Sequence, residues 1–427
     1  MTLSIVIFLL IFIILLLLGT PIVFCLGISS LVYLLVSGIA MSVVSQKIIY
    51  SLQSFPLLAV PLFILAGTLM NTGGITKRIF DFLEAIIGRL KGGLAQVNIL
   101  ASMVFAGMSG TAVADAAGLG VVEIEAMKSR NYKLDYSAAV TIASSVVGPI
   151  IPPSVVLIIY GVIAEESIGR LFLGGLLPGL VIIFILMVYV YFTAVKYGLP
   201  RHEKQSLKNK WKKFMVALPS LLAPVIILGG IVTGITTPTE AGGIAVIYSI
   251  ILGLLYKELD FKKFKKDLFE TAKITSKILF VVATAAVFGW ALTRMQVPAL
   301  LARTILSITD NKIVIILLIN VILILLGTFM ETISIIMILV PVLIPIANAI
   351  GIDFVHLGII LVFALMIGTM TPPYGICLYI MSDITKLKVE KIVKAVIPFF
   401  IPLIVSLIVI SIFPEIVTFL PNLILGK

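Results

Sequence analysis

Two short runs in this chain combine glycine, hydroxyl side chains and a proline pair within apolar sequence. They are Gly148 to Ser154 and Gly368 to Tyr374, each a glycine followed after three residues by Pro-Pro. Each proline pair removes two backbone N–H donors and frees carbonyl groups one turn earlier. In a membrane, the carbonyl end of a broken helix suits a monovalent cation, and its amide end suits a carboxylate. The chemistry predicted for these runs is therefore the binding of a cation and an anion.

Hydroxyl side chains lie beside both runs. They also lie near Gly107 and Gly327, where small or polar residues interrupt two long apolar segments. Hard oxygen ligands without a fixed carboxylate fit a weakly held monovalent cation better than Ca²⁺ or Zn²⁺. Each hydroxyl could equally bond its own helix backbone four residues earlier. The hydroxyls concerned are those of Ser109, Thr111, Ser144, Ser145, Thr328, Thr332, Ser334, Thr369 and Thr371.

Three of the carboxylates within apolar sequence are candidates for a functional or capping role. Asp115 and Glu331 are predicted at membrane depth, where an ionisable side chain indicates function, although Asp115 could instead be solvated on the cytoplasmic leg of its hairpin. Glu240 follows Thr237-Pro238-Thr239, which has the pattern of a capping box with proline at the first helical position. We therefore expect Glu240 to cap a helix.

The composition excludes a soluble protein. Of 427 residues, 61% are hydrophobic and 12% charged, whereas an average soluble domain has about 25% charged residues. At roughly 20 residues per crossing, the chain is predicted to be an all-α polytopic membrane protein with about 10–12 transmembrane helices. The net charge of +11 lies in loops between apolar segments and indicates topology rather than nucleic-acid binding. Isolated cysteines and histidines support neither a disulfide framework nor a zinc site.

The apolar sequence divides into segments, or windows, each long enough to form at least one membrane-spanning helix. Two of them, 94–127 and 313–350, are interrupted in the middle and are predicted to be re-entrant hairpins, each followed by a broken helix at 137–163 and 354–386. The remaining windows are 2–19, 20–42, 51–72, 169–196, 214–235, 238–256, 274–294 and 395–425.

The basic loops predict the orientation. The loops at 201–213 and 257–277 should lie in the cytoplasm by the positive-inside rule. Counting spans from them, the first hairpin opens to the cytoplasm and the second to the outside. Gly148 and Gly368 are 220 residues apart, and the same offset relates Gly107 to Gly327. A shared register with opposite orientation is typical of an inverted-topology repeat, which places the binding site where the halves meet.

This repeat predicts the domain organisation. We expect N-terminal scaffold helices at 1–72, an amphipathic arm at 73–92 and the first transport half at 93–196. Central scaffold helices with basic cytoplasmic loops follow at 197–273, then the scaffold and arm of the second repeat at 274–312, and the second transport half at 313–427.

Four motifs together resemble a known family across essentially the whole chain. They are Gly107 to Asp115, Gly148 to Ser154, Thr237 to Ala241 and Gly368 to Gly375. They are similar to those of the large membrane subunit (M subunit) of TRAP transporters, the tripartite ATP-independent periplasmic carriers. The resemblance implies a multi-pass protein of the bacterial inner membrane with a scaffold and an elevator-type transport domain.

The resemblance also implies the activity and the partners. The expected activity is Na⁺-driven uptake of an organic acid, of the sialic acid or C4-dicarboxylate class, with no cofactor besides Na⁺ as coupling ion. The expected partners are a periplasmic substrate-binding protein and a small four-helix membrane subunit. Because the chain begins at its first span, we expect that subunit to be a separate polypeptide.

Carried onto this sequence, the family's two Na⁺ sites and its substrate site fall at the hairpin tips and helix breaks. The first Na⁺ site would involve Ser109, Gly110, Thr111, Ser144, Ser145 and Gly148. The second would involve Thr328, Glu331, Thr332, Gly368, Thr369 and Met370. The residues expected to contact the substrate are Asp115, Pro152, Ser154, Ser334, Thr371, Pro372 and Tyr374.

Two other classes of function compete with this one. A stand-alone Na⁺/dicarboxylate symporter shares paired hairpins and broken helices but needs no binding protein, and uptake with and without that protein would separate the two. An intramembrane enzyme is disfavoured, because the sequence has no Ser-Lys, His-metal or paired-carboxylate arrangement. A nucleotide-binding loop of the Gly-x-x-x-x-Gly-Lys-Ser/Thr type is also absent, which argues against ATP hydrolysis by this chain.

Overall fold

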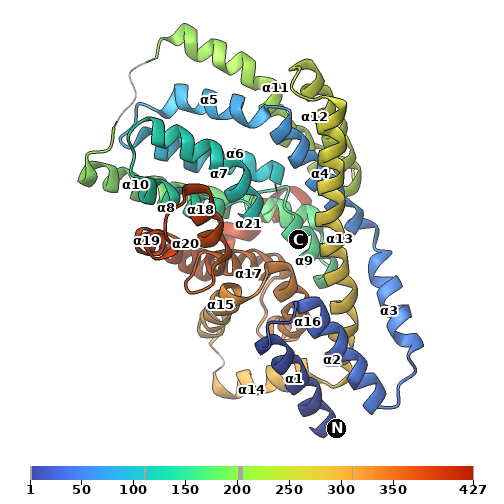
Figure 1. Ribbon diagram of the computed structural model, residues 1–427. Helices are drawn as coiled ribbons and strands as arrows, with labels where there is room; N and C mark the ends of the chain where they lie inside the picture. Colours follow the sequence, from blue (N-terminus) through green and yellow to red (C-terminus); the bar gives the residue numbers. More distant parts are fainter. Residues whose placement is uncertain (1, 110–111, 201–204, 310, 427) are drawn as a thin grey trace.

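The computed structural model describes residues 2–109, 112–200, 205–309 and 311–426, and in these residues all regular secondary structure is helical (Figure 1). Eight of the described helices are long and apolar enough to cross a membrane, and the shorter apolar helices have 10–17 residues. The prediction of an all-helical polytopic membrane protein is confirmed.

The first half of the chain contains helices α1 to α10. Their bounds are α1 Thr2–Leu17, α2 Ile22–Val36, α3 Ser42–Leu52, the 3-10 helix η1 Phe55–Leu58, α4 Ala59–Thr72, α5 Ile75–Ile87, α6 Gly93–Ser109, α7 Ala112–Ser129, α8 Leu134–Ser145, α9 Val155–Ala164 and α10 Ile168–Tyr197.

The second half contains helices α11 to α21. Their bounds are α11 Leu207–Val232, α12 Pro238–Leu255, α13 Phe261–Arg294, α14 Val297–Ile308, α15 Lys312–Phe329, α16 Thr332–Ala349, α17 Phe354–Thr369, α18 Ile376–Thr385, α19 Val389–Val396, the 3-10 helix η2 Ile397–Phe399, α20 Phe400–Ile412 and α21 Glu415–Leu425.

Side-chain caps fix several helix starts. In the predicted capping box, the Glu240 backbone N–H donates to Thr237 Oγ1 over 3.2 Å, and the Thr237 N–H donates to Glu240 Oε2 over 2.7 Å. Two orphan donors at the start of α12 are thereby satisfied. The expectation that Glu240 caps a helix is confirmed.

The structure differs from the predicted elements in three places. Helix α3 lies in a stretch that the apolar windows left without a helix of its own. Helix α13 begins at Phe261, inside the predicted basic loop, because Asp260 caps it and lysine is a good helix former. The last window, 395–425, is divided into several helices, with Pro398 in η2 and Pro414 just before α21.

The helices follow the offset of 220 residues closely. The bounds of α7 map onto those of α16, and α6, α9 and α5 map within two residues onto α15, α18 and α14 at their starts. Figure 1 shows α5 near the top of the molecule and α14 at the bottom, with the long α13 running along one side between them. This arrangement has the form expected of an inverted repeat.

The two repeats nevertheless pack differently. Arm helix α5 lies against α6, whereas its counterpart α14 lies against α16 rather than against α15. Helices α6 and α7 pack side by side, but α15 packs chiefly on α17, while α16 packs on α13, α14 and α9. The second predicted hairpin is therefore splayed, and one face of α15 stays exposed, including Val321, Leu325 and Phe329.

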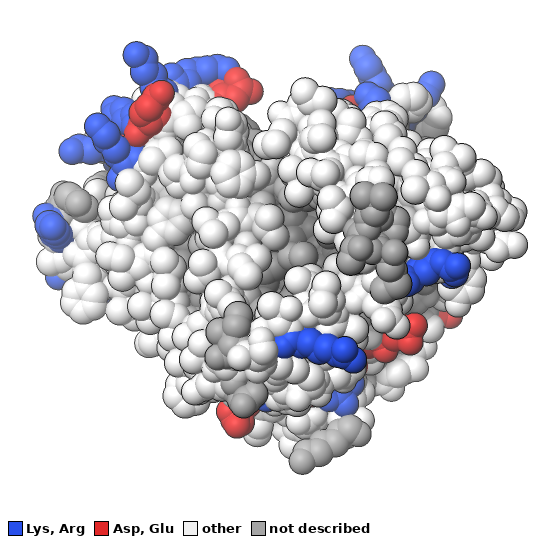
Figure 2. Space-filling model, turned by 90° about the horizontal axis from the view of Figure 1, so that it is seen from below, with Lys and Arg blue, Asp and Glu red and all other residues white. Residues whose placement is uncertain are grey.

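The outer surface is mostly apolar. Figure 2 shows the molecule from below, where most of the surface carries no charge and the charged side chains form small separate groups. Large apolar side chains such as Val225, Phe280 and Leu325 are more than half exposed. An exposed apolar surface of this extent is typical of a protein that is covered by lipid.

Candidate functional site

The first break separates α8, which ends at Ser145, from α9, which begins at Val155. The chain turns here through hydrogen bonds of 3.1 Å from the N–H groups of Val147 and Gly148 to carbonyls in the last turn of α8. A side chain at Gly148 would collide with the carboxylate of Asp115 on α7. Asp115 is only 1% exposed, so its carboxylate lies against the break and not in solvent.

A buried polar cluster stands behind this break. Ser144 Oγ donates to Asn98 Oδ1 over 2.8 Å, and Ser102 Oγ donates to Ser144 Oγ over 2.9 Å. The Asn98 side-chain amide donates to Thr141 Oγ1 over 2.7 Å. All four residues are buried. A connected polar cluster of this kind fixes the orientation of its members, so it holds the Ser144 oxygen in place at the end of α8.

The residues after the first Pro-Pro pair are buried as well. Ser154 caps α9, because its Oγ accepts from Leu157 N over 3.2 Å and donates to the Pro149 carbonyl over 2.6 Å. Ser154 is 0% exposed, and Pro152 is buried. In this conformation, Ser154 therefore holds the break together, while the substrate contact assigned to both residues from family resemblance remains a prediction.

The second break separates α17, which ends at Thr369, from α18, which begins at Ile376. Just before it, α15 and α17 approach at Gly327 and Gly368. A Cβ atom at Gly368 would lie 2.7 Å from Gly327 Cα, closer than real Cβ contacts occur. Only glycine permits this backbone approach, so the two glycines fix how α15 and α17 cross beside the break.

The hydroxyls of the second break bond their own helices. Thr328 Oγ1 donates to the Ile324 carbonyl over 3.0 Å, and Thr369 Oγ1 donates to the Met366 carbonyl over 2.7 Å. Thr371, two residues beyond the end of α17, donates its Oγ1 proton to the Ile367 carbonyl of α17 over 2.7 Å. A hydroxyl that donates its single proton still has lone pairs that can accept. These bonds are therefore compatible with cation binding and also serve the local fold.

Glu331 lies between α15 and α16 and caps α16. Its Oε2 accepts from the backbone N–H of Ser334 over 3.1 Å and from Ser334 Oγ over 3.3 Å. Ser334 is fully buried and turned toward Glu331. Thr332 begins α16 directly beside them. The carboxylate thus satisfies the start of α16 and brings an anionic group to the tip between the two helices.

The two breaks meet through Cys377 on α18. Its Sγ lies 3.7 Å from Thr369 Oγ1 and also contacts the Ser145 side chain at the other break. The half-helices pack crosswise, because α9 of the first repeat lies on α16 of the second, and α18 of the second lies on α7 of the first. Each break is therefore completed by the hairpin of the other repeat.

The structure brings most of the predicted site residues to these two breaks. Ser144, Ser145 and Gly148 lie at the first, and Thr328, Gly368, Thr369 and the buried Met370 at the second. Ser109 ends α6, but its side chain, together with Gly110 and Thr111, lies outside the described residues.

Sequence reasoning missed the residues behind the breaks. It did not predict that a hydrogen-bonded cluster would join Asn98, Ser102, Thr141 and Ser144. It also took Cys377 to be isolated. A usable signal was present, because positions 98 and 102, and 141 and 144, share one helix face in apolar sequence. Polar side chains paired in this way within a membrane helix indicate contact with another polar helix face.

The two breaks differ in exposure. The residues described from Ile142 to Val162 around the first break are buried almost throughout. At the second, Pro372 is partly exposed and Tyr374 is 61% exposed, with its ring 5.6 Å from that of Phe329. The predicted substrate contacts Pro372 and Tyr374 are therefore accessible in this conformation, whereas Pro152 and Ser154 are not.

The whole length of the chain can be compared with known proteins. The family described as "Tripartite ATP-independent periplasmic transporter, DctM component" matches residues 9–416. The chain belongs to this TRAP transporter family. The resemblance inferred from the four motifs is confirmed, and a TRAP large permease is a transport protein, not an enzyme.

Two relatives cover nearly all of this TRAP permease. The sialic acid TRAP transporter large permease protein SiaM of Vibrio cholerae is 42% identical over 410 residues, 96% of each chain. The C4-dicarboxylate TRAP transporter large permease protein DctM of Pseudomonas aeruginosa is 37% identical over 399 residues, 93% of each chain. Among solved structures, the Alcanivorax borkumensis YdaH transporter has a TM-score of 0.64 at 13% identity and covers 88% of this chain and 89% of its own. That similarity shows the fold.

One prediction for this TRAP permease follows from the buried cluster. If the first break binds Na⁺ as the sequence predicts, replacing Ser144 with alanine should weaken the apparent Na⁺ affinity about five- to tenfold, since one oxygen and the donor to Asn98 are lost. The measurement is the Na⁺ dependence of uptake at matched protein level. Ser137→Ala is the matched control on the same helix, because Ser137 is also buried but its hydroxyl donates to the carbonyl of Lys133, the N-cap residue of α8. An unchanged Na⁺ curve for Ser144→Ala would remove Ser144 from the site.

Proposed function

We propose that this chain is the membrane-spanning carrier of a Na⁺-coupled secondary transporter that takes up an organic acid by an elevator-type movement. The observation that carries the proposal is the crosswise packing of the two helix breaks, in a chain of the TRAP family. Hydroxyl and carbonyl oxygens lie at each break, among them those of Ser144 at the first and Thr369 at the second. These are the ligand types that suit a weakly held monovalent cation.

Two helical bodies support the elevator. Helices α2, α4, α12 and α13 pack on one another as a scaffold, and the arms α5 and α14 lead from it to α6 and α16 of the transport domain. Helix α9 lies on scaffold helix α4, whereas the main contacts of α18 are with α7, α8 and α19. With the basic loops on the cytoplasmic side, α18 belongs to the inner half, so this packing supports an inward-open position.

The proposed substrate class and partners are those suggested by the relatives and by the family. Relatives named for sialic acid and for C4-dicarboxylates suggest an organic acid of one of these classes. The tripartite family suggests two partners, a periplasmic binding protein that delivers the substrate and a small four-helix membrane subunit. The carrier itself would lie in the bacterial inner membrane. A carrier of this fold that works without a binding protein is the alternative.

The proposal predicts Na⁺-dependent and electrogenic uptake without ATP. One elementary charge moving through 100 mV is worth about 2.3 kcal/mol, so accumulating an anion inside a negative interior requires net positive charge to move inward. Two cation sites give net inward charge for a monocarboxylate, whereas a dicarboxylate would need a third Na⁺. The chain should be reconstituted with its small subunit in liposomes, with a Na⁺ gradient and a K⁺/valinomycin potential, using sialic acid and succinate as probes.

The arms of this experiment separate the alternatives. Uptake should require Na⁺ and loaded binding protein, and an inside-negative potential should accelerate it. Uptake that proceeds without Na⁺, or that ignores the potential, would contradict the proposed coupling. Equal uptake with and without the binding protein would favour the stand-alone symporter.

A further inference from the structure

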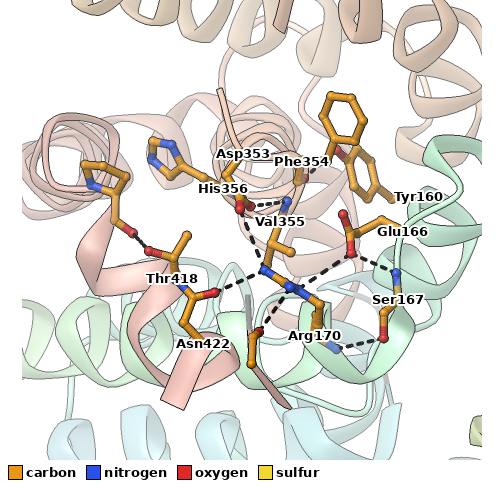
Figure 3. A network of polar contacts seen from close by, with 12 residues as sticks. Tyr160, Glu166, Ser167, Arg170, Asp353, Phe354, Val355, His356, Thr418 and Asn422 are labelled. Carbon is orange, nitrogen blue, oxygen red and sulfur yellow. Dashed lines mark hydrogen bonds and ion pairs between the residues drawn. The ribbon is translucent and has the colours of Figure 1, made fainter. Parts of the chain in front are cut away.

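Arg170, in the first turn of α10, lies where three separate parts of the chain meet (Figure 3). Its guanidinium group donates to Asn422 Oδ1 over 3.1 Å and to the Gly426 carbonyl over 3.2 Å, both in the C-terminal segment. It also lies 3.8 Å from a carboxylate oxygen of Glu166 and 3.8 Å from one of Asp353. One planar fork of donors thereby joins α10, the start of α17 and α21.

The partners of Arg170 are themselves helix caps. Asp353 Oδ1 accepts from the N–H groups of Val355 and His356 at the start of α17, over 2.8 and 3.2 Å. Ser167 Oγ accepts from the N–H of Arg170 at the start of α10, over 3.3 Å. Arg170 therefore joins two helix starts whose backbone geometry is already fixed by their caps.

The two helices held at this point lead to the two breaks. Helix α9 starts at the first break and ends at Ala164, and α17 starts directly after its cap Asp353 and ends at the second break. Tyr160 on α9 adds a hydrogen bond of 2.6 Å to the Phe354 carbonyl on α17. An α-helix behaves as a stiff rod that rises 1.5 Å per residue, so fixing these ends also fixes the spacing between the breaks.

The other end of the transport domain has a weaker counterpart. There Lys391 of α19 lies 3.8 Å from Asp135 of α8, close to the positions that the repeat offset assigns to Arg170 and Asp353. The Lys391 side chain is 59% exposed, against 21% for Arg170. Helix α21 extends beyond the repeat and reinforces only the Arg170 end. An exposed single ion pair contributes little, so the two ends are held unequally.

We propose that Arg170 is a positioning residue that keeps the two cation sites at a fixed spacing, so that Na⁺ binding at one break favours Na⁺ binding at the other. The proposal rests on the Na⁺-coupled function proposed above. Without the guanidinium, Glu166 and Asp353 are left as neighbouring carboxylates without their shared cation, and the common end of α9 and α17 is held only by their packing and by the Tyr160–Phe354 hydrogen bond. The loss of Arg170 should therefore weaken the cooperativity between the two Na⁺ sites. Positive cooperativity between two sites is measured as a Hill coefficient above one.

The test is a Na⁺ titration of the intact complex, with K⁺ keeping the ionic strength constant. The thermal stability of the purified complex and the initial uptake rate are both measured against Na⁺ concentration. For Arg170→Gln, the half-saturating Na⁺ concentration should rise about fivefold or more, and the Hill coefficient should fall from near 2 toward 1. Arg170→Lys should restore part of the effect, because it keeps the charge but not the fork.

Two further variants complete the experiment. Asn422→Ala removes only the α21 contact and should shift the Na⁺ curve in the same direction by a smaller factor. Lys391→Gln is the matched control at the exposed pair and should leave the curve unchanged. The proposal is wrong if Arg170→Gln binds Na⁺ like the wild type, or if Arg170→Gln, Arg170→Lys and Asn422→Ala all merely lose folded protein. Wild-type protein that shows no Na⁺ dependence would contradict the proposed function instead.

Discussion

Replacing Gly368 with valine is expected to abolish Na⁺-dependent uptake. A Cβ atom there would lie 2.7 Å from Gly327 Cα and 2.7 Å from the Ile324 carbonyl oxygen, both backbone atoms that cannot rotate away. Helices α15 and α17 would have to separate beside the second break. Overpacking of this kind costs about 1–3 kcal/mol, so even a partly tolerated change should reduce the apparent Na⁺ affinity about tenfold.

The measurement is uptake in proteoliposomes at matched protein level, together with the Na⁺-dependent thermal shift of the purified complex. Gly243→Val is the matched control, because Gly243 lies in α12 with no atom within 4 Å of its built Cβ position. Gly368→Ala tests the same contact with the smallest side chain and should show an intermediate loss. Full Na⁺-dependent uptake by Gly368→Val would show that the close approach of α15 and α17 has no part in the site.

A covalent link between α13 and α16 is expected to stop transport completely. A Cβ atom at Gly289 would lie 3.7 Å from Pro341 Cγ, so cysteines at these two positions should be bridged by Hg²⁺. In the proposed division of the chain, this bridge joins the scaffold to the transport domain. A carrier that moves one body past the other cannot complete its cycle while the two are joined.

The control pair lies within the scaffold. Gly27 on α2 faces Thr284 on α13, with its built Cβ atom 3.7 Å from Thr284 Cγ2. The Gly27→Cys/Thr284→Cys pair should also bind Hg²⁺, yet leave uptake at the level of its parent protein, which lacks Cys25 and Cys377. Continued transport by fully bridged Gly289→Cys/Pro341→Cys protein would contradict the elevator. Arrest by the control pair would show that Hg²⁺ blocks by another route.

The sequence predicted the features that a local pattern encodes. The proline pairs, the glycine interruptions and the 220-residue offset are visible as residue types at fixed spacing, and the helix boundaries follow them. The Thr237–Glu240 capping box was also readable, because all of its groups lie within four residues. A helix, α5, lies within the stretch 73–92, where apolar and charged residues alternate at helical spacing. In each case, the cause of the structure is close to it in sequence.

The remaining features depend on contacts between distant residues. Nothing near Arg170 in the sequence indicates that Asn422 and Asp353 will accept its hydrogen bond and ion pair. The pairing of Asn98 with Thr141 likewise needs α6 and α8 to be packed first. The lysines at the start of α13 predicted a loop by their charge, but charge sets topology without preventing a helix.

The crosswise packing of the half-helices also has a consequence for biosynthesis. As the chain is inserted in order from its N-terminus, α9 leaves the ribosome long before α16, on which it packs in the finished protein. Until α16 and α17 arrive, α9 lacks part of the protein surface on which it packs, while α10 of the first half already lies against the break at Ile150 and Ile151. The transport domain therefore reaches its final form only after the second half has been translated.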